Sequence, residues 1–377
     1  MTDAVKDTGS PTREPPTREP PTRESAVFER IEAFRRRKPR LRDEVVTLAH
    51  GAGGKASAAL LEAVFFPAFG GDSVATPTDA AVVTLASGER LAFSTDSFVV
   101  HPLRFPGGSI GHLAVHGTIN DLAMMGAHPL VLSAAFVLEE GFPVEDLKSV
   151  VADMAEAAAT AGVPIVTGDT KVVDRGAADG IYISTSGIGV IPEGRDLAAA
   201  RVIPGDVVIM SGTMGDHGTA VMLARGDLAL DADIASDTAA LHGLVESLLS
   251  SAPATRWLRD ATRGGVGTVC NELARAADVT VVLEESLLPV LPAVGAACEL
   301  LGIDPLYVAN EGKFVAVVAP GEADAALAAL RAHPLGRDAA RIGEIREEPP
   351  GIVVLRTPIG GTRIVDMLVG DPLPRIC

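Results

Sequence analysis

The sequence predicts an α+β fold built from two α/β domains. The chain has 377 residues, which is enough for two domains of ordinary size. Runs of strand and helix character mix without a regular βαβ rhythm, so a doubly wound parallel sheet is disfavoured. Each half also contains a glycine-rich turn before a helix, HGAGGKAS at 50–57 and GDHGTA at 215–220. We therefore place the junction between the two domains near residues 192–202.

The N-terminal domain is predicted to cover residues 45–191. Apolar and β-branched runs predict strands, and apolar residues at helical spacing predict helices that end at glycine. The predicted strands are 44–50, 80–85, 90–100, 163–168 and 181–191. The predicted helices cover 110–125, ended by Gly126, and a segment from about Pro143 to Gly162. A strand over 202–212 opens the second domain.

Four segments follow from this pattern. Residues 11–25 read PTREPPTREPPTRES, a repeat with no apolar side chain, so it cannot bury enough surface to offset its ordering entropy. We expect a disordered extension at 1–44, the N-terminal domain at 45–191, a C-terminal α/β domain at 202–360 and a mobile tail at 361–377.

Composition limits the classes of partner and the compartment. The formal net charge of −17 repels phosphate backbones, so we expect no nucleic-acid partner. No run of about 18 apolar residues occurs, and no membrane span is expected. The cysteines, Cys270, Cys298 and Cys377, have neither zinc nor disulfide spacing, which indicates a reducing cytoplasm. Cys270 and Cys298 lie in apolar helical contexts, whereas Cys377 is the last residue.

Acidic residues at the ends of apolar runs are the main chemical signal. A buried carboxylate needs a partner, and Mg²⁺ takes one or two carboxylates together with phosphate oxygens. Helix capping and turn formation explain any single one of them equally well. These residues are Asp79, Asp96, Asp121, Asp169 and Asp260. Lys171 follows Asp169 by two residues and Glu311 precedes a predicted strand, patterns that ordinary surface ion pairs also produce.

The glycine-rich stretch HGAGGKAS is a second, weaker signal. Glycines before a helix can expose backbone N–H groups to phosphate. Lys55 is followed by Ala56, so the stretch is neither a P-loop nor a Rossmann fingerprint. An ordinary turn and a phosphate site remain equally open.

Six stretches together resemble one family. They are FSTDSFVVHPLRFPGGSIGHLAVHGTINDLAMMGAHP (93–129), VTGDTKVVDRG (166–176), SGTMGDHGTAVMLARG (211–226), RDATRGGVGTV (259–269), ANEGKF (309–314) and PRIC (374–377). In this order they resemble the HypE hydrogenase maturation factors, which are carbamoyl dehydratases. The aspartate and glycine patterns are shared with the wider superfamily of aminoimidazole-ribotide synthetase, selenophosphate synthetase and thiamine-phosphate kinase.

The resemblance implies a fold and a reaction. The fold is of the aminoimidazole-ribotide synthetase type, in which N-terminal sheets pair in a homodimer and ATP binds near that interface. HypF, a carbamoyltransferase, would carbamoylate Cys377. ATP-dependent dehydration would turn the S-carboxamide into an S-cyanate. The cyano group would then pass to iron on a HypC–HypD complex for the nickel–iron centre.

The resemblance also implies roles for individual residues. Gly53, Gly54 and Lys55 would lie near the phosphates, and Cys377, Lys171 and Glu311 would be catalytic, with the base and electrostatic roles of the last two exchangeable. Nucleotide contacts would further involve Asp96, Asn120, Asp121, Asp169 and Thr170. The metal ligands would be Asp79, Asp96, Asp121 and Asp260. Asp79, in PTDAAV, matches the family pattern more loosely than the others.

Two alternatives remain open. Another ATP-using synthetase of the superfamily is one, although selenophosphate synthetases carry Cys or selenocysteine in the N-terminal glycine-rich segment and HGAGGKAS has neither. The other is a non-catalytic scaffold that only presents the thiol of Cys377 to a partner. That scaffold leaves the acidic residues without a role.

Overall fold

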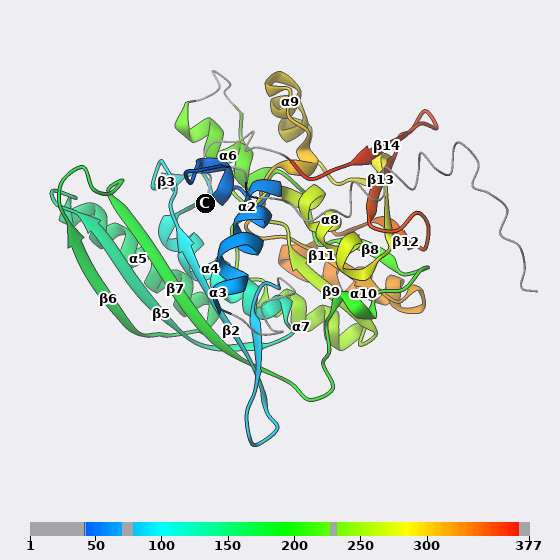
Figure 1. The fold of residues 1–377 in the computed structure, drawn as a ribbon, viewed down its shortest axis with the longest axis horizontal. Coiled ribbons are helices and arrows are strands. Elements are labelled where there is room, and N and C mark those ends of the chain that lie inside the picture. The colour runs from blue at the N-terminus through cyan, green and yellow to red at the C-terminus, as the bar shows by residue number, and fades with distance from the viewer. Residues whose placement is uncertain (1–40, 42, 70–77, 227–231, 369–377) are drawn as a thin grey trace, which may run out of the picture. The chain divides into compact units, whose positions relative to one another are not determined.

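The computed structural model describes residue 41 and residues 43–69, 78–226 and 232–368 (Figure 1). All of these belong to one compact unit, Pro39–Cys377. Residues 11–25 and Cys377 lie outside the described residues.

A five-stranded sheet dominates the N-terminal half of the described chain. Neighbouring strands are antiparallel except β5 and β6, which are parallel because the helix α5 (Val144–Ala161) returns the chain to the same end of the sheet. In spatial order the strands are β1 (Ala81–Thr84), β2 (Arg90–Phe98), β7 (Ile181–Ile191), β5 (His128–Glu139) and β6 (Ile165–Val173).

In the part of the chain that the structure describes, helices pack on one face of this sheet. Along β7 the odd-numbered side chains are buried, and the even-numbered ones are half-buried or exposed. The buried face packs against α4 (Ile110–Met124) and α5 in a shared apolar core. The opposite face carries apolar side chains open to solvent, among them Phe93, which is 44% exposed, and Ile188, which is 38% exposed.

A seven-stranded sheet forms the C-terminal half. In spatial order its strands are β14 (Thr362–Val365), β13 (Ile352–Arg356), β10 (Thr280–Glu284), β12 (Ala340–Arg346), β8 (Val207–Met210), β11 (Phe314–Val318) and β9 (Thr255–Asp260). Every residue of β8 and β11 is buried, because helices cover both faces. On one face lies α8 (Gly265–Ala277); on the other lie α7 (His242–Ser251) and α10 (Ala323–Ala332).

Helix α4 is buried on all sides. It contacts β2 and β7 of the first sheet, and β9 and α7 of the C-terminal half. The same apolar core takes in α6 (Asp216–Arg225) and α9 (Pro292–Leu301). The two halves therefore share a core through α4, although each half has its own sheet.

The sequence predicted the fold class and several elements. The α+β fold is confirmed, and α4, α5 and β7 follow the predicted ranges, with Gly162 in the left-handed conformation (φ 70°) at the end of α5. The strand expected at 44–50 is wrong. Its apolar residues Val45, Val46 and Leu48 are 71, 75 and 70% exposed, and a short 3₁₀ helix, η1 (Leu48–Gly51), stands there instead.

Five short helical or strand segments complete the described N-terminal half. After η1 come α2 (Lys55–Leu60), η2 (Leu61–Phe65) and α3 (Phe66–Phe69), and a small hairpin joins β3 (Arg104–Phe105) to β4 (Gly108–Ser109). Five 3₁₀ turns lie in the C-terminal half: η4 (Ala199–Arg201), η5 (Glu285–Leu287), η6 (Pro305–Tyr307), η7 (Pro320–Glu322) and η8 (Pro334–Gly336).

Part of the segment predicted as a mobile tail is in the sheet. Residues 362–365 form β14, which pairs with β13, and Val365 is fully buried. Met367 is 5% exposed. The chain is thus packed as far as the end of the described residues at Leu368. Among those residues, no helix has the length and apolar character needed to cross a bilayer.

Candidate active site

Three aspartates from distant parts of the chain converge where the two halves meet. Asp79 immediately precedes the strand-forming run of β1, Asp121 lies on α4, and Asp260 ends β9. One carboxylate oxygen from each lies within 4.8 Å of the other two. We call this group the carboxylate triad; it joins the N-terminal sheet, the shared helix and the C-terminal sheet at one point.

Burial makes the triad costly to ionise. Loss of solvent raises the pKa of Asp260 to about 6, with the charge of Asp96 adding to the effect. The pKa values of Asp79 and Asp121 are raised well above the ordinary value, first by burial and then by neighbouring carboxylates. A divalent cation would offset this repulsion, and carboxylate oxygens are the ligands Mg²⁺ prefers. The residues present therefore fit Mg²⁺.

Protein groups offset part of the negative charge. The Nε of Arg259 lies 2.8 Å from Asp79 Oδ1, and its Nη2 lies 3.1 Å from Glu272 Oε2. Ser94 donates its hydroxyl proton to Asp121 and lies within 3.3 Å of the carbonyl oxygen of Asp79. Since Arg259 is shared with Glu272, it does not neutralise the triad.

Asp96 lies beside the triad on β2. It is two residues after Ser94 on the same face of the strand, the face that packs on α4. Burial raises the pKa of Asp96, and Arg263 Nη2 lies 3.9 Å from its Oδ1. The predicted metal ligands thus gather in one place, with Asp96 next to the three that meet most closely.

Glu311 joins the same acidic region from the loop before β11. Its side chain is almost fully buried, at 4% exposure for the residue. Burial, followed by the charges of Asp260 and Asp96, raises the pKa of Glu311 well above its ordinary value. A raised pKa makes the ionised carboxylate more basic than that of an ordinary glutamate.

The glycine turn at 53–55 packs against the end of the described chain. A Cβ on Gly53, whose φ is 78°, would come 2.9 Å from Arg263 Cβ, and one on Gly54 would come 2.6 Å from the carbonyl oxygen of Leu368. Lys55 donates its backbone N–H to that carbonyl at 3.1 Å, and its Nζ lies 2.7 Å from Asp366 Oδ2. The turn lies next to Arg263, yet the ammonium group of Lys55 is paired with Asp366.

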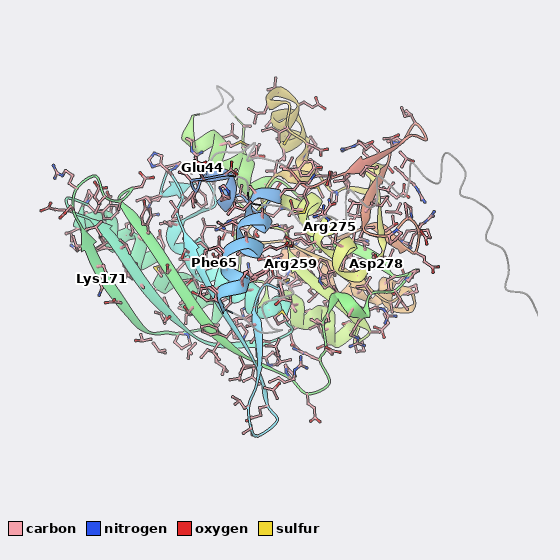
Figure 2. All side chains as sticks on the ribbon, in the orientation of Figure 1. Glu44, Phe65, Lys171, Arg259, Arg275 and Asp278 are labelled. Atoms are coloured by element: carbon pink, nitrogen blue, oxygen red, sulfur yellow. The ribbon has the colours of Figure 1, made fainter. Side chains whose placement is uncertain are left out.

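Three predicted residues lie elsewhere, on the edge strand β6. Asp169 and Lys171 pair with each other, with 2.7 Å between Oδ2 and Nζ, and their side chains are 63 and 68% exposed. In the sheet register, Asp96 lies opposite Thr185, Thr185 opposite Ala134, and Ala134 opposite Gly168. The backbone next to Asp169 is therefore three strand spacings, or about 14 Å, from Asp96. Figure 2 places Lys171 well away from Arg259.

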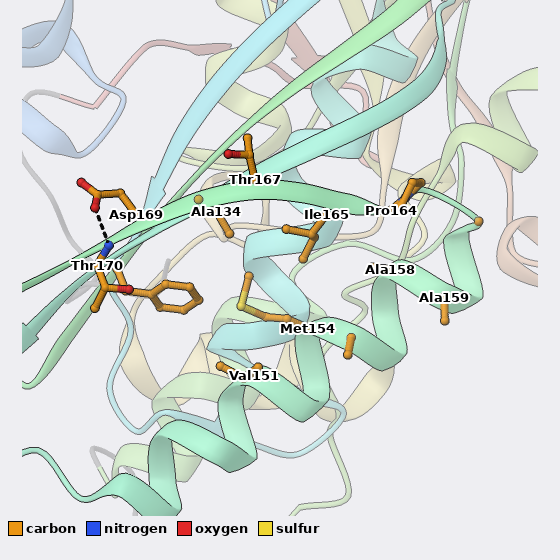
Figure 3. Close-up of a pocket in the computed structure, with 14 residues that line it drawn as sticks. Ala134, Val151, Met154, Ala158, Ala159, Pro164, Ile165, Thr167, Asp169 and Thr170 are labelled. Atoms are coloured by element: carbon orange, nitrogen blue, oxygen red, sulfur yellow. Dashed lines mark hydrogen bonds between the residues drawn. The ribbon is translucent and has the colours of Figure 1, made fainter.

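A pocket of about 1030 Å³ lies between this edge strand and α5 (Figure 3). Its lining is largely apolar, with Phe136, Val151 and Met154, and Asp169 and Thr170 lie at its rim. Thr170 donates its backbone N–H to Asp169 Oδ1 at 2.8 Å. This pocket and the carboxylate triad share no lining residue and are separate sites in the chain.

Asn120 has a role that the sequence did not predict. Its Nδ2 donates to the carbonyl oxygens of Ala239 at 3.0 Å and Glu311 at 3.2 Å. Its Oδ1 accepts the backbone N–H of Leu241 at 2.8 Å. The amide is thus bonded to backbone on every side, and Asn120 fastens segments together where we had expected a nucleotide contact.

Comparisons with known proteins agree with this geometry. Residues 77–191 match the family "AIR synthase related protein, N-terminal domain", and residues 204–356 match the corresponding C-terminal domain. The chain is 54% identical over 332 residues to "Carbamoyl dehydratase HypE" of Cupriavidus necator, covering 88% of this chain and 95% of that protein.

The chain belongs to the HypE family.

Solved structures of HypE proteins have the same fold. One, described as a HypE–HypF complex, is 50% identical and has a TM-score of 0.78; the match covers 82% of this chain and all of that one. Another, HypE in complex with ATP, is 45% identical with a TM-score of 0.74, covering 88% of this chain and all of that one. Its relatives thus include a HypE captured with a protein partner and one captured with a nucleotide.

Sequence reasoning about this HypE-family chain missed the arginines of the site. Arg259 and Arg263 flank Asp260 in RDATR, and both approach predicted metal ligands. The close spacing of two arginines and one aspartate in RDATR was the sequence signal that could have predicted them. Asp237, which accepts the backbone N–H of Glu311 at 3.0 Å, has no signal in the sequence because 74 residues separate the two.

Proposed function

We propose that this chain dehydrates an S-carboxamide on its own Cys377 to an S-cyanate, with ATP as the co-substrate. As a member of the HypE family it is an enzyme, a carbamoyl dehydratase of nickel–iron hydrogenase maturation. The observation that carries the residue assignment is the buried carboxylate triad with Glu311 beside it. A site of this kind suits phosphoryl transfer together with proton removal.

Asp79, Asp121 and Asp260 would hold Mg²⁺, with Asp96 completing the acidic wall. Bound Mg²⁺ would neutralise part of the triphosphate charge and of the charge that develops during transfer. Arg263 is placed between Asp96 and Gly53, where a cation and exposed backbone N–H groups suit phosphate oxygens. An ATP complex of a relative supports nucleotide binding here.

The reaction needs a better leaving group than oxide. The carboxamide oxygen attacks the γ-phosphorus of ATP, ADP leaves, and one amide proton is lost as the O-phosphorylated imidate forms. Removal of the second amide proton then expels phosphate and leaves S–C≡N. Glu311 is the proposed base for these protons, because a raised pKa makes a carboxylate more basic. Lys171 is its electrostatic partner, and the two roles remain exchangeable.

The position of Leu368 supports delivery of Cys377 to this site. Leu368 contacts the glycine turn, which adjoins Arg263, and nine residues (377 − 368) follow it. At about 3.3 Å per residue, nine residues reach roughly 30 Å at most. A terminal segment of this length suits a thiol that visits a carbamoylating partner, the ATP site and an acceptor.

A homodimer would resolve the position of Lys171. The open face of the N-terminal sheet carries Phe93 and Ile188, and the register places Asp169 and Lys171 on that same face. Pairing of two such faces would cover the apolar side chains and bring Lys171 toward the other subunit's triad. We infer that Lys171 and Asp169 serve the active site of the neighbouring subunit.

The remaining partners follow from the reaction. The HypE–HypF complex of a relative supports HypF as the carbamoyl donor for Cys377. The cyano group would pass to iron on a HypC–HypD complex. Buried thiols at Cys270 and Cys298 fit a cytoplasmic protein.

The decisive experiment follows the C-terminal peptide by mass. S-carbamoylated protein is incubated with Mg-ATP, and the peptide is expected to lose the mass of one water while ATP is hydrolysed. Cys377→Ala should abolish S-cyanate formation and leave ATP binding close to normal. An unchanged mass with ATP intact would instead favour the thiol scaffold.

A further inference from the structure

Glu311 is held by its backbone from two sides. Its N–H donates to Asp237 Oδ1 at 3.0 Å, and its carbonyl oxygen accepts from Asn120 Nδ2 at 3.2 Å. The next residue, Gly312, presses against the same segment: a Cβ there would lie 1.8 Å from the carbonyl oxygen of Asp237. The loop that carries Glu311 therefore has little freedom to shift without breaking one of these contacts.

The contacts made by Asp237 belong to residues 236–241, which we call the strap. Ser236 donates its N–H to the carbonyl oxygen of Pro106 at 2.7 Å, and Thr238 Oγ1 lies 3.0 Å from Nδ1 of His116 on α4. At its other end, Leu241 donates its N–H to Asn120 on α4. The strap thus ties the Glu311 loop to the helix that carries Asp121.

Asp237 is fixed in the strap by charge and burial. Its side chain is 3% exposed, and Oδ2 lies 3.4 Å from Nζ of Lys313, whose side chain is 12% exposed. A buried carboxylate that accepts an N–H while paired with a cation has a well-defined position. Lys313 lies two residues after Glu311, so Asp237 contacts the loop at two points, the backbone N–H of Glu311 and the side chain of Lys313.

We propose that Asp237 is a positioning residue for the dehydration, acting through Glu311. The carboxyl group of Glu311 lies near the carboxylates of Asp260, Asp96 and Asp237 itself, whose charges disfavour its ionised form. The bond from the backbone N–H of Glu311 to Asp237 holds the backbone of Glu311 in place against this repulsion. The inference rests on the proposed role of Glu311 as the base, and it concerns the geometry of that base rather than contact with substrate.

Two single variants test it in the full-length, S-carbamoylated protein. Asp237→Ala removes the acceptor and should slow single-turnover dehydration roughly 10- to 100-fold, because small displacements of a catalytic group have effects of this size. Asp237→Asn keeps an oxygen that can accept the N–H of Glu311, so it should recover much of the rate. ATP affinity should be unchanged in both.

Asp206→Ala is the matched control. Asp206 is also buried, accepts the backbone N–H of Ile203 at 2.9 Å and pairs with Arg256 at 2.8 Å. It precedes β8, at the end of the sheet opposite Glu311. A loss of stability similar to that of Asp237→Ala, without the loss of rate, would separate positioning from general destabilisation.

The double variant Asp237→Ala/Glu311→Gln decides how Asp237 acts. If Asp237 acts through Glu311, the double variant should dehydrate no more slowly than Glu311→Gln alone. A further loss in the double variant would overturn the inference, as would a wild-type rate for Asp237→Ala. A wild-type rate for Glu311→Gln would instead remove the proposed base. Should Asp237→Ala not fold, Asn120→Ala, which frees the carbonyl group of Glu311, takes its place in the same comparison.

Discussion

The two groups of charged residues predicted to act on ATP and the carboxamide differ in kind. The carboxylate triad is buried, comes from three distant segments and has raised pKa values. Asp169 and Lys171 stand two residues apart on one exposed strand and neutralise each other, and this pairing lowers the pKa of Asp169.

The difference separates a group of residues that is assembled within one chain from a pair that needs the proposed homodimer to reach that group. Converging buried carboxylates with too few cations already have the composition of a metal site. An exposed, self-paired Lys–Asp couple has no such charge deficit and contributes little by itself. We therefore expect variants of the triad to damage each subunit's own site, and variants of Lys171 to damage the neighbouring one.

Asp260→Asn should have the largest effect. Removal of one of three converging carboxylates should lower Mg-dependent ATP affinity and slow dehydration by about 100-fold or more, since electrostatic stabilisation of transferred charge is lost. The metal-free variant should also unfold at a higher temperature than the wild type above pH 6, because a buried charge has been removed. Calorimetric titration with Mg-ATP and thermal unfolding measure the two effects.

The matched control for that change is Asp324→Asn, an exposed aspartate in the first turn of α10. It should alter neither nucleotide affinity nor the rate of dehydration. Wild-type Mg-ATP affinity in Asp260→Asn would exclude Asp260 as a metal ligand. The carboxylate triad and the Asp169–Lys171 pair would then no longer differ in the way proposed.

Lys171→Met should have a smaller effect on rate, about 10-fold or more, with ATP binding retained. Mixing the Lys171→Met variant with the Asp260→Asn variant tests which subunit's site Lys171 serves. In an equal mixture of the two variants, half of the dimers contain one subunit of each. If Lys171 serves the neighbouring subunit, each mixed dimer has one intact site out of two. About a quarter of the wild-type activity should therefore return. Single-turnover assays after subunit exchange measure this recovery.

The baseline activity is that of the two variants mixed without subunit exchange and measured in the same single-turnover assay. No recovery after exchange, with mixed dimers demonstrated by mass spectrometry, would place Lys171 in its own subunit's site or outside the mechanism. Recovery above the baseline would mean that residues of two subunits act in one site, because a monomer carries only one of the two substitutions.

Local pattern was enough to predict the parts of the fold that one segment specifies by itself. Apolar spacing and a terminal glycine located α5, and alternation located β7, because each needs only its own residues. The strand expected at 44–50 failed for the complementary reason: β-branched residues form a strand only where another strand pairs with them, and none of the described strands pairs with Val45 and Val46.

The site was predicted as residue types but not as an arrangement. Asp79, Asp121 and Asp260 were recognised singly, but their approach to within 4.8 Å depends on the packing of α4 between the two sheets. Asn120 stands next to Asp121 in the chain, yet the helix turns it toward the strap and Glu311. Which of two adjacent polar residues faces a site is decided by tertiary contacts, and no spacing rule contains them.

The smallest predicted effect concerns pH and Mg²⁺. In the folded protein the pKa of Asp260 is raised from 3.8 to about 6, so its contribution to stability is fully present below pH 3.8 and is lost as the pH rises through about 6. Mg²⁺ binds the ionised carboxylates, so it should raise the melting temperature by a few degrees at pH 8 and by much less at pH 5. Thermal unfolding with and without Mg²⁺, in the absence of nucleotide, measures the difference. Asp260→Asn should remove most of the shift at pH 8, whereas Lys171→Met should leave it intact. Equal shifts at the two pH values would mean that Mg²⁺ binds somewhere other than the triad.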